Sequence, residues 1–223
     1  MPLVNEVMSK CRPLEFFPDY IKQGYYPFGT EGFALYHQRV ENILDMLLNI
    51  ELPQLRSVDI GNIRKIKALL AIISTEVPML VDITKLATLT GIARTTMLAY
   101  LQYLHEAKLI RLLYSDDLSV KKMQKPDKIL MENTNLLQAL SLQVPNIGTM
   151  RETFFCNQLG YTHQVEYNKR GDYLIDHKYV FEIGGKAKDG KQVANMENAY
   201  IASDECDYPI GNKLPLWLFG LMY

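Results

Sequence analysis

The chain has 223 residues, a length that allows one large domain or two to three small ones. Hydrophobic side chains make up 48% of it and aromatic side chains 10%, so the chain can bury a sizeable core and is not an intrinsically disordered protein. Its 24 basic and 25 acidic residues leave a formal charge of -1, which excludes a protein that coats nucleic acid with its whole surface.

Several motifs are absent from the sequence. It contains no G-x-x-x-x-G-K-[ST] loop, so we expect no ATP site and no ATPase activity from this chain alone. The G-x-S-x-G, H-E-x-x-H and G-x-G-x-x-G signatures of common hydrolases, zinc proteases and dinucleotide-binding proteins are also missing. The most familiar enzyme chemistries therefore have no motif here.

The sequence predicts a cytoplasmic protein without a membrane partner. No apolar run approaches the roughly 18 residues of a membrane span, and the first residues lack the apolar core of a signal peptide. Cys11, Cys156 and Cys206 are odd in number and far apart, which argues against a disulfide framework. The histidines show no ligand spacing with one another or with cysteine, so none is predicted to bind metal; they are His37, His105, His163 and His177.

Residues 1–57 are predicted to form a helical, lid-like segment. Pro18 and Pro27 are expected to punctuate a short helix in a stretch rich in aromatic residues. These aromatics are best explained by core packing, with a base-stacking platform as the alternative. A helix over 33–50 follows, because apolar residues recur there at steps of three and four: Phe33, Tyr36, Val40, Ile43, Leu44, Leu47 and Leu48.

Residues 58–144 are predicted to form a winged-helix domain. Its three helices are expected over about 62–74, from Asp82 or Thr84 to Gly91, and over 95–107. Gly91 stands where a helix-turn-helix needs a positive φ. LIRLLYSD is expected to be the first strand of the wing, and residues 129–131 are expected to form a strand that leads into a helix after Asn133.

The winged helix has two possible roles. Seven basic and four acidic residues between 58 and 115 make this the one basic segment. In proteins of this architecture that read DNA, the third helix enters the major groove through its N-terminal residues, here Arg94, Thr95 and Thr96. Further contacts with phosphates are predicted from Lys85, Lys108 and Arg111. The alternative is a structural connector between domains. The lysines of the wing fit either a phosphate-contacting edge or a solvated surface: Lys121, Lys122, Lys125 and Lys128.

Residues 145–223 predict a mixed α/β domain, so the fold class of the whole chain is α+β. A helix over MRETFFCNQLG is followed by three short strands, HQVEYN, GDYLIDH and KYVFEIGG. A second helix is expected over about 191–199, and a very apolar closing strand over LPLWLFGLMY.

This order of elements, with acidic residues at fixed places, matches the requirements of a PD-(D/E)xK nuclease. Such an enzyme holds a divalent metal with carboxylates near the ends of two adjacent strands, beside a lysine that positions the attacking water. Asp172 and Glu182 are the predicted ligands of Mg²⁺ or Mn²⁺, and Lys186 is the predicted catalytic lysine. Glu152 and Gln192 would support the site from the flanking helices.

The spacing of the lysine is unusual. Active members carry Glu-x-Lys on one face of a strand, whereas the corresponding position here is Gly184 and Lys186 lies four residues after Glu182. A bulge at Gly184 and Gly185 would restore the distance. Two alternatives therefore stay open, a competent metal site and a retained fold with little or no chemistry.

Taken together, the segments FFPDYIKQGYYPF, DITKLATLTGIARTTMLAYLQYLHEAKLI, KPDKILMENTNLL, GTMRETFFCNQL, GDYLIDHKYVFEIGGK and PLWLFGLMY resemble the C-terminal part of AAA-type ATPases common in Bacteroidetes and archaea. The resemblance covers nearly the whole chain. It implies a lid remnant over 14–50, a winged helix and a restriction-endonuclease-like domain of the kind called DUF4143. In the family a P-loop domain precedes these parts, so the resemblance implies that Met1 opens a fragment, a truncated gene product or an engineered chain.

Three hypotheses follow from the residues and the resemblance. The first is a non-catalytic module of an AAA-type ATPase that binds double-stranded DNA or a protein. The second is a Mg²⁺- or Mn²⁺-dependent nuclease, and the third is a winged-helix protein that binds DNA without cutting it.

Overall fold

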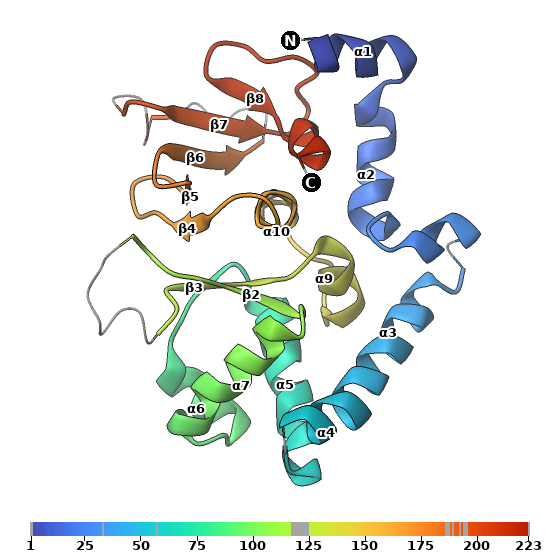
Figure 1. The fold of residues 1–223 in the computed structure, drawn as a ribbon, viewed down its shortest axis with the longest axis vertical. Helices are drawn as coiled ribbons and strands as arrows, with labels where there is room; N and C mark the ends of the chain where they lie inside the picture. Colours follow the sequence, from blue (N-terminus) through green and yellow to red (C-terminus); the bar gives the residue numbers. More distant parts are fainter. Residues whose placement is uncertain are drawn as a thin grey trace.

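The structure is a computed structural model that describes residues 2–32, 34–56, 58–116, 125–185, 188, 190, 191, 193 and 196–222. It combines helices with one three-stranded and one five-stranded sheet, which confirms the predicted α+β class (Figure 1). Among the described residues, no helix is long and apolar enough to cross a membrane.

The N-terminal helices form a chain along one side of the molecule, from the level of the five-stranded sheet to the far end of the winged helix (Figure 1). They are α1 (Pro2–Lys10), α2 (Pro13–Gln23), a 3-10 turn η1 (Pro27–Glu31), α3 (Tyr36–Met46), a π-helical turn η2 (Leu47–Glu51) and α4 (Leu52–Arg56). Pro18 lies inside α2 and not at its boundary, while Pro27 begins η1. The predicted apolar stripe is buried at Tyr36, Val40, Leu44 and Leu48, whereas Phe33 lies outside the described residues.

The central part has the helices and strands predicted for a winged helix. Its elements are α5 (Ile60–Glu76), β1 (Met79–Leu80), α6 (Ile83–Thr90), α7 (Arg94–Glu106), β2 (Ile110–Leu113), β3 (Lys128–Met131) and α9 (Thr134–Leu140). The strands pair antiparallel in the order β1-β3-β2. Residues 117–124, with Lys121 and Lys122, lie outside the described residues.

The boundaries of α6 follow from its capping residues. The Asp82 carboxylate accepts hydrogen bonds from the backbone N–H groups of Thr84 and Lys85, at 2.9 and 3.0 Å, which satisfies donors that the first turn leaves free. Gly91 ends the helix with φ 65°, the left-handed conformation predicted for it. The start of the helix-turn-helix is therefore encoded locally.

The C-terminal part is a five-stranded sheet with α10 (Ile147–Leu159) packed on it. The strands are β4 (Val165–Tyr167), β5 (Tyr173–Ile175), β6 (Tyr179–Gly184), β7 (Ala199–Ser203) and β8 (Lys213–Pro215), in that order across the sheet. β4, β5 and β6 are antiparallel neighbours, whereas β7 and β8 run parallel to β6. The three strands predicted after α10 are thus confirmed.

Two predictions for the end of the chain are wrong. The helix expected over 191–199 is absent from the described residues there, which form turns until Ala199 begins β7. Asn198 has φ 55°, a left-handed conformation that no helix contains. The expected closing strand is a short β8 followed by a 3-10 helix, η3 (Leu216–Leu221), which buries Leu216, Trp217 and Phe219.

A single cluster of buried apolar side chains connects all three parts. It extends from Ile21 in α2 through the winged helix to Phe219 in η3. Phe155 of α10 belongs to the C-terminal end of this cluster. The centre of its ring lies 5.1 Å from the centre of the Phe181 ring and 4.7 Å from that of Phe219. The predicted boundaries near 57 and 145 therefore separate parts that share one core.

Candidate functional site

The structure brings Asp172 and Glu182 together where β5 and β6 begin to pair. Tyr173 pairs with Phe181 in this antiparallel ladder, so the next residues, Asp172 and Glu182, project on the same face. The Asp172 backbone N–H donates to the Phe181 carbonyl at 2.9 Å, and the Asp172 carboxylate accepts from the Ile183 N–H at 2.6 Å. Burial raises the pKa of Asp172, and the Ile183 N–H opposes that rise.

Glu152 reaches the same region from α10. Its Oε2 accepts a hydrogen bond from the Tyr173 hydroxyl and lies 2.6 Å from the ammonium nitrogen of Lys128. Lys128 comes from β3 of the winged helix, and its side chain is only 9% exposed. Its nitrogen also lies 4.6 Å from the centre of the Tyr173 ring, a cation–π distance. The winged helix therefore supplies a buried cation to the carboxylates of the C-terminal part.

A second lysine neutralises Glu182. The Lys188 ammonium lies 2.8 Å from Oε1 of Glu182, whose side chain is 2% exposed. The hydrogen bond to Glu182 raises the pKa of Lys188, and the charges of Asp172 and Glu152 add to that effect. Lys186 and Gln192, the residues predicted to assist this site, lie outside the described residues. Lys188 was not predicted, although it follows Lys186 by two residues.

We call Glu152, Asp172, Glu182, Lys128 and Lys188 the carboxylate cluster. Its three carboxylates face two ammonium groups, so two of its three negative charges are paired and one is left. Oxygens from Glu152, Asp172 and Glu182 do not come within 4.8 Å of one another as a set of three. One observation favours a ligand, because Oε2 of Glu182 is buried and accepts no hydrogen bond from the described residues.

As a site for Mg²⁺ or Mn²⁺, the carboxylate cluster fits poorly. Divalent magnesium needs oxygen ligands that converge at about 2.0 to 2.1 Å, and those oxygens must be free of competing cations. Here Lys128 already pairs with Glu152, and Lys188 already pairs with Glu182. Lys128 and Lys188 would therefore compete with a divalent cation for two of the three carboxylates.

The predicted DNA-contacting residues are scattered over the winged helix. Arg94 and Thr95 are exposed at the N-terminus of α7, with Thr96 half-buried beside them. Together with Lys125 and Asp82, Arg94 and Thr95 line a cavity of about 290 Å³. Lys85 is exposed but pairs with Glu76 at 2.8 Å. The accessible cations of this face are thus few and partly neutralised.

Lys108 and Arg111 do not belong to that face. Lys108 follows the C-terminal end of α7, about 20 Å along the helix from Arg94 at a rise of about 1.5 Å per residue. Arg111 is buried, with its side chain 8% exposed, so the predicted phosphate contact is wrong for this residue. The prediction failed because β2 is covered on both faces, which the basic character of the segment did not reveal.

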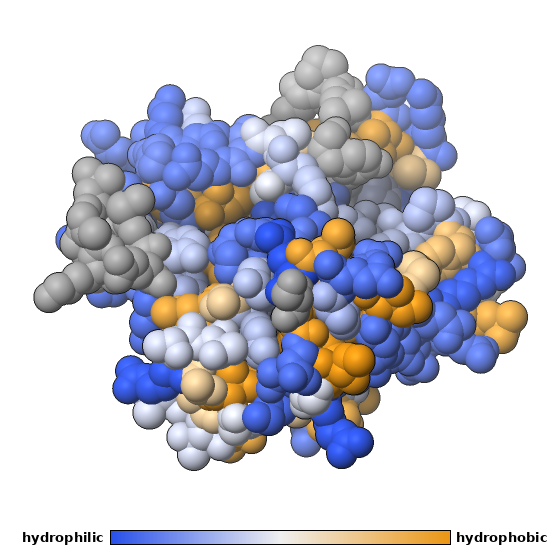
Figure 2. Space-filling model, turned by 60° about the horizontal axis from the view of Figure 1, so that its bottom comes forward, coloured by the Kyte–Doolittle hydropathy of each residue, from blue (hydrophilic) through white to orange (hydrophobic). Residues whose placement is uncertain are grey.

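The end of the molecule formed by the winged helix also carries exposed hydrophobic side chains. Figure 2 shows them as separate patches between hydrophilic areas. The exposed residues from α4, α5 and α6 include Leu55 (76%), Ile60 (80%) and Leu89 (54%). Scattered apolar side chains are normal on a protein surface, so they mark no site by themselves.

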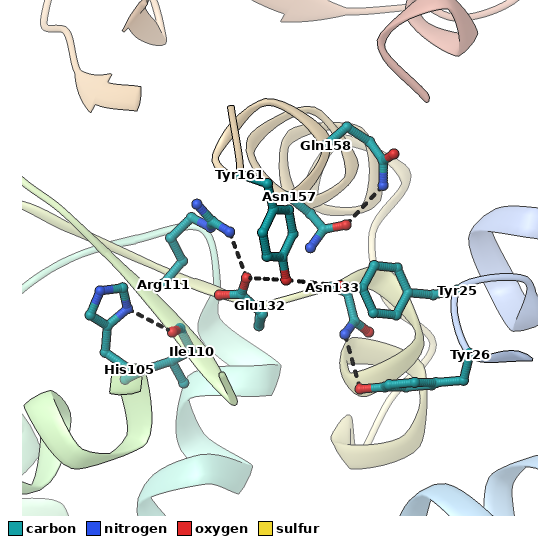
Figure 3. Close-up of polar contacts among 10 residues, drawn as sticks. All are labelled: Tyr25, Tyr26, His105, Ile110, Arg111, Glu132, Asn133, Asn157, Gln158 and Tyr161. Atoms are coloured by element: carbon teal, nitrogen blue, oxygen red, sulfur yellow. Dashed lines mark hydrogen bonds and ion pairs between the residues drawn. The ribbon is translucent and has the colours of Figure 1, made fainter. Parts of the chain in front are cut away.

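Arg111 instead anchors a buried polar junction (Figure 3). Its guanidinium lies 2.5 Å from Oε1 of Glu132, which is 1% exposed. The Tyr161 hydroxyl, from the loop after α10, donates to the same oxygen at 3.2 Å and lies 2.9 Å from the Tyr25 hydroxyl of the N-terminal segment. The junction therefore joins all three parts of the chain.

The side chains around this junction are incompletely paired. Arg111 Nε, Glu132 Oε2 and Asn157 Nδ2 are buried and have no hydrogen-bond partner among the described residues. Burial, with the neighbouring Glu132 charge, raises the pKa of Tyr161 well above its usual range. The hydroxyl therefore stays protonated and acts as a donor at neutral pH. Sequence patterns gave no signal for these contacts, since the residues come from distant segments.

Comparison with known proteins adds one finding. The model of a domain of unknown function, DUF8612, matches residues 14–146, more than half of the chain. The chain belongs to the DUF8612 family. No curated protein and no solved structure matches it.

The DUF8612 match begins in α2 and ends at Asn146, the N-cap of α10. It contains the N-terminal helices except α1, the winged helix and Lys128. Glu152, Asp172 and Glu182 lie beyond it. The family match therefore covers the lysine of the carboxylate cluster that comes from the winged helix, but none of its carboxylates.

Proposed function

We propose that this DUF8612 protein is a non-catalytic interaction module, the C-terminal portion of an AAA-type ATPase, that binds double-stranded DNA or a protein partner. The observation that carries the proposal is the pairing of two of the three carboxylates, Glu152 and Glu182, with Lys128 and Lys188. Each of these lysines competes with a divalent cation for its carboxylate, so the electrostatic demand of the cluster for such an ion is reduced.

The link to an AAA-type ATPase rests on the sequence resemblance and on the order of the parts. Helices, winged helix and mixed sheet follow one another as that resemblance implies. The chain has no P-loop, so ATP hydrolysis would belong to another part of the complete protein. On this proposal the chain is a docking element for that motor.

A nuclease is the second candidate, because Asp172 and Glu182 share one face of the β5–β6 hairpin beside a lysine. Incubation of the chain with linear and supercoiled DNA in Mg²⁺ or Mn²⁺ separates the two functions. We expect no cleavage above the level of a Glu182→Gln variant. Cleavage that Glu182→Gln abolishes, while Glu197→Gln retains it, would overturn the non-catalytic proposal; Glu197 is a described acidic residue in the turn before β7.

Winged-helix binding to DNA without cleavage is the third candidate, and exposed Arg94 and Thr95 at the start of α7 support it. It names double-stranded DNA as the partner, whereas the main proposal also allows a protein. A titration of a duplex of about 25 base pairs at low salt, followed by fluorescence anisotropy, decides between DNA and protein as the bound class.

A further inference from the structure

A second group of polar side chains lies at the seam between the winged helix and the five-stranded sheet. Asp116 follows β2, Glu166 lies in β4, and His177 occupies the turn between β5 and β6. A parallel bridge between Ser115 and Tyr167 joins the two segments beside them. One ligand atom from each of Asp116, Glu166 and His177 lies within 4.8 Å of the other two.

The spacing of these atoms suits a common ion. Nδ1 of His177 lies 2.9 Å from Oε2 of Glu166 and 3.3 Å from Oδ1 of Asp116. Ligands held by one tetrahedral zinc ion at about 2.0 to 2.2 Å stand about 3.3 to 3.6 Å apart. Small side-chain adjustments would bring all three atoms to that separation.

Glu166 gives an independent indication of a ligand. It is only 8% exposed, and its Oε2 is buried without a donor in hydrogen-bond geometry. Its other oxygen accepts from Nε2 of Gln164 at 3.1 Å, which orients the carboxylate with Oε2 toward His177 and Asp116. Its one nearby partner is Nδ1 of His177 at 2.9 Å, so this oxygen and the ring nitrogen face each other either as an ion pair or as two ligands of one ion.

The neighbouring groups leave this cluster acidic. His163, the other histidine nearby, pairs with Asp176 at 2.7 Å and so lies outside it. The carboxylates of Asp116 and Glu166 both lie beside the His177 imidazole. Two carboxylates therefore face one imidazole, and a bound cation would relieve their repulsion.

We propose that Asp116, Glu166 and His177 bind a divalent transition-metal ion, with Zn²⁺ as the best match. The imidazole nitrogen selects against Mg²⁺ and Ca²⁺, which prefer oxygen ligands alone. The side chains of Asp116 and His177 are 48% and 50% exposed, so water can complete the coordination. Asp116 also lines a cavity of about 380 Å³ with Lys169 and Arg170.

The ion would fasten two parts of the chain to each other. Asp116 belongs to the winged helix, whereas Glu166 and His177 belong to the five-stranded sheet. Because the three ligands are brought together only by folding, binding of the ion would stabilise the folded chain.

The test uses the whole chain, stripped with chelator and dialysed against Zn²⁺. We expect one zinc per chain by elemental analysis and a rise in Tm on zinc addition. Glu166→Gln and His177→Ala should lower the affinity for zinc by at least tenfold. His163→Ala, the matched control in the neighbouring ion pair, should bind zinc as the unaltered chain does.

Asp116→Asn changes an exposed position and keeps the test valid if a variant of Glu166 or His177 fails to fold. Absence of stoichiometric zinc in the unaltered chain would overturn the proposal and leave simple ion pairs at this seam. Zinc retained by both Asp116→Asn and His177→Ala would also overturn it, and would place the metal elsewhere, for example at the exposed Cys11.

Discussion

The ammonium nitrogen of Lys128, in the winged helix, lies 2.6 Å from Oε2 of Glu152, in the helix that packs on the five-stranded sheet. Both side chains are largely buried, at 9% and 18% exposed. A pair of this kind costs desolvation of two charges, and removal of one partner leaves the other charge buried alone. The position of the winged helix and the charge state of the carboxylate cluster are therefore linked.

Replacement of Lys128 by methionine should destabilise the chain. The change keeps most of the apolar stem but leaves Glu152 with the Tyr173 hydroxyl as its remaining partner, so we expect the free energy of unfolding to fall by about 3 kcal/mol. Urea denaturation measures it. Lys125→Met, at an exposed position of the same segment, should stay within about 0.5 kcal/mol of the unaltered chain. Equal losses in the two variants would refute a special role for Lys128.

The Arg111–Glu132 pair should behave as a coupled unit. Arg111→Met and Glu132→Leu should each lower the free energy of unfolding by about 3 to 5 kcal/mol, because each leaves an unpaired buried charge. The double variant should be more stable than the sum of the two losses implies, which a double-mutant cycle detects. Tyr161→Phe, which removes the hydrogen bonds to Glu132 and to the Tyr25 hydroxyl but no charge, should cost about 2 kcal/mol. Strict additivity of the two charge changes would contradict the buried pairing.

Asp172 should make stability depend on pH. Burial raises its pKa in the folded chain above 3.8, so the folded state binds a proton more tightly than the unfolded state does. As pH rises from about that value through the folded pKa, ionisation costs stability. Asp172→Asn removes this cost, so its stability relative to the unaltered chain should improve between acidic and neutral pH in urea titrations.

Asp82→Asn is the control of opposite sign. The hydrogen bond from the Lys85 N–H lowers the pKa of Asp82, so its ionised form contributes stability above the unfolded pKa and loses it as pH falls through the folded pKa. The unaltered chain should therefore gain over Asp82→Asn as pH rises toward neutrality. The same direction of change in both variants would show that the shift at Asp172 is misassigned.

Cys156 should resist modification in the folded chain. It is 1% exposed, and burial raises its pKa to about 12, so almost no thiolate is present at neutral pH. Ellman's reagent should label Cys11, which is exposed, at once, and Cys156 only after unfolding. The Cys11→Ser variant should lose the fast phase except for the part that half-buried Cys206 contributes. A fast phase that Cys156→Ser removes would contradict the buried position.

Arg94 tests binding to DNA. If the duplex is the partner, Arg94→Ala should weaken binding and lower the slope of log affinity against log salt by about one, because one phosphate contact is lost. Lys108→Ala, at the opposite end of α7, should leave the slope unchanged. No binding of the unaltered chain at low salt would reject DNA and leave a protein as the partner class.

Local signals predicted much of this fold. The Asp82 cap, the Gly91 stop and the spacing of apolar residues located α6, α7 and the strands around them, because each depends on nearby sequence. The closing strand, in contrast, was predicted wrongly. Apolar residues over 214–222 suit a strand by composition, but burial of Leu216, Trp217 and Phe219 on one side of a 3-10 turn follows from packing against α10.

The carboxylates of the candidate site were predictable, whereas their partners were not. Asp172 and Glu182 were predicted because their places near the ends of two successive strands match a PD-(D/E)xK core, and the antiparallel pairing of β5 with β6 does put them on one face. Lys128 reaches Glu152 only because the winged helix docks on α10, and no spacing rule encodes that docking. His177 was not predicted for the same reason: it approaches Asp116 only because the five-stranded sheet, which also carries Glu166, packs against the winged helix.

The shared core from Ile21 to Phe219 limits which parts of such a chain recombination can exchange. A recombination break near residue 146 would have to deliver a new neighbour with a complementary apolar surface and a carboxylate for Lys128. Exchange of either half alone would leave buried apolar and charged groups of the other half without their partners.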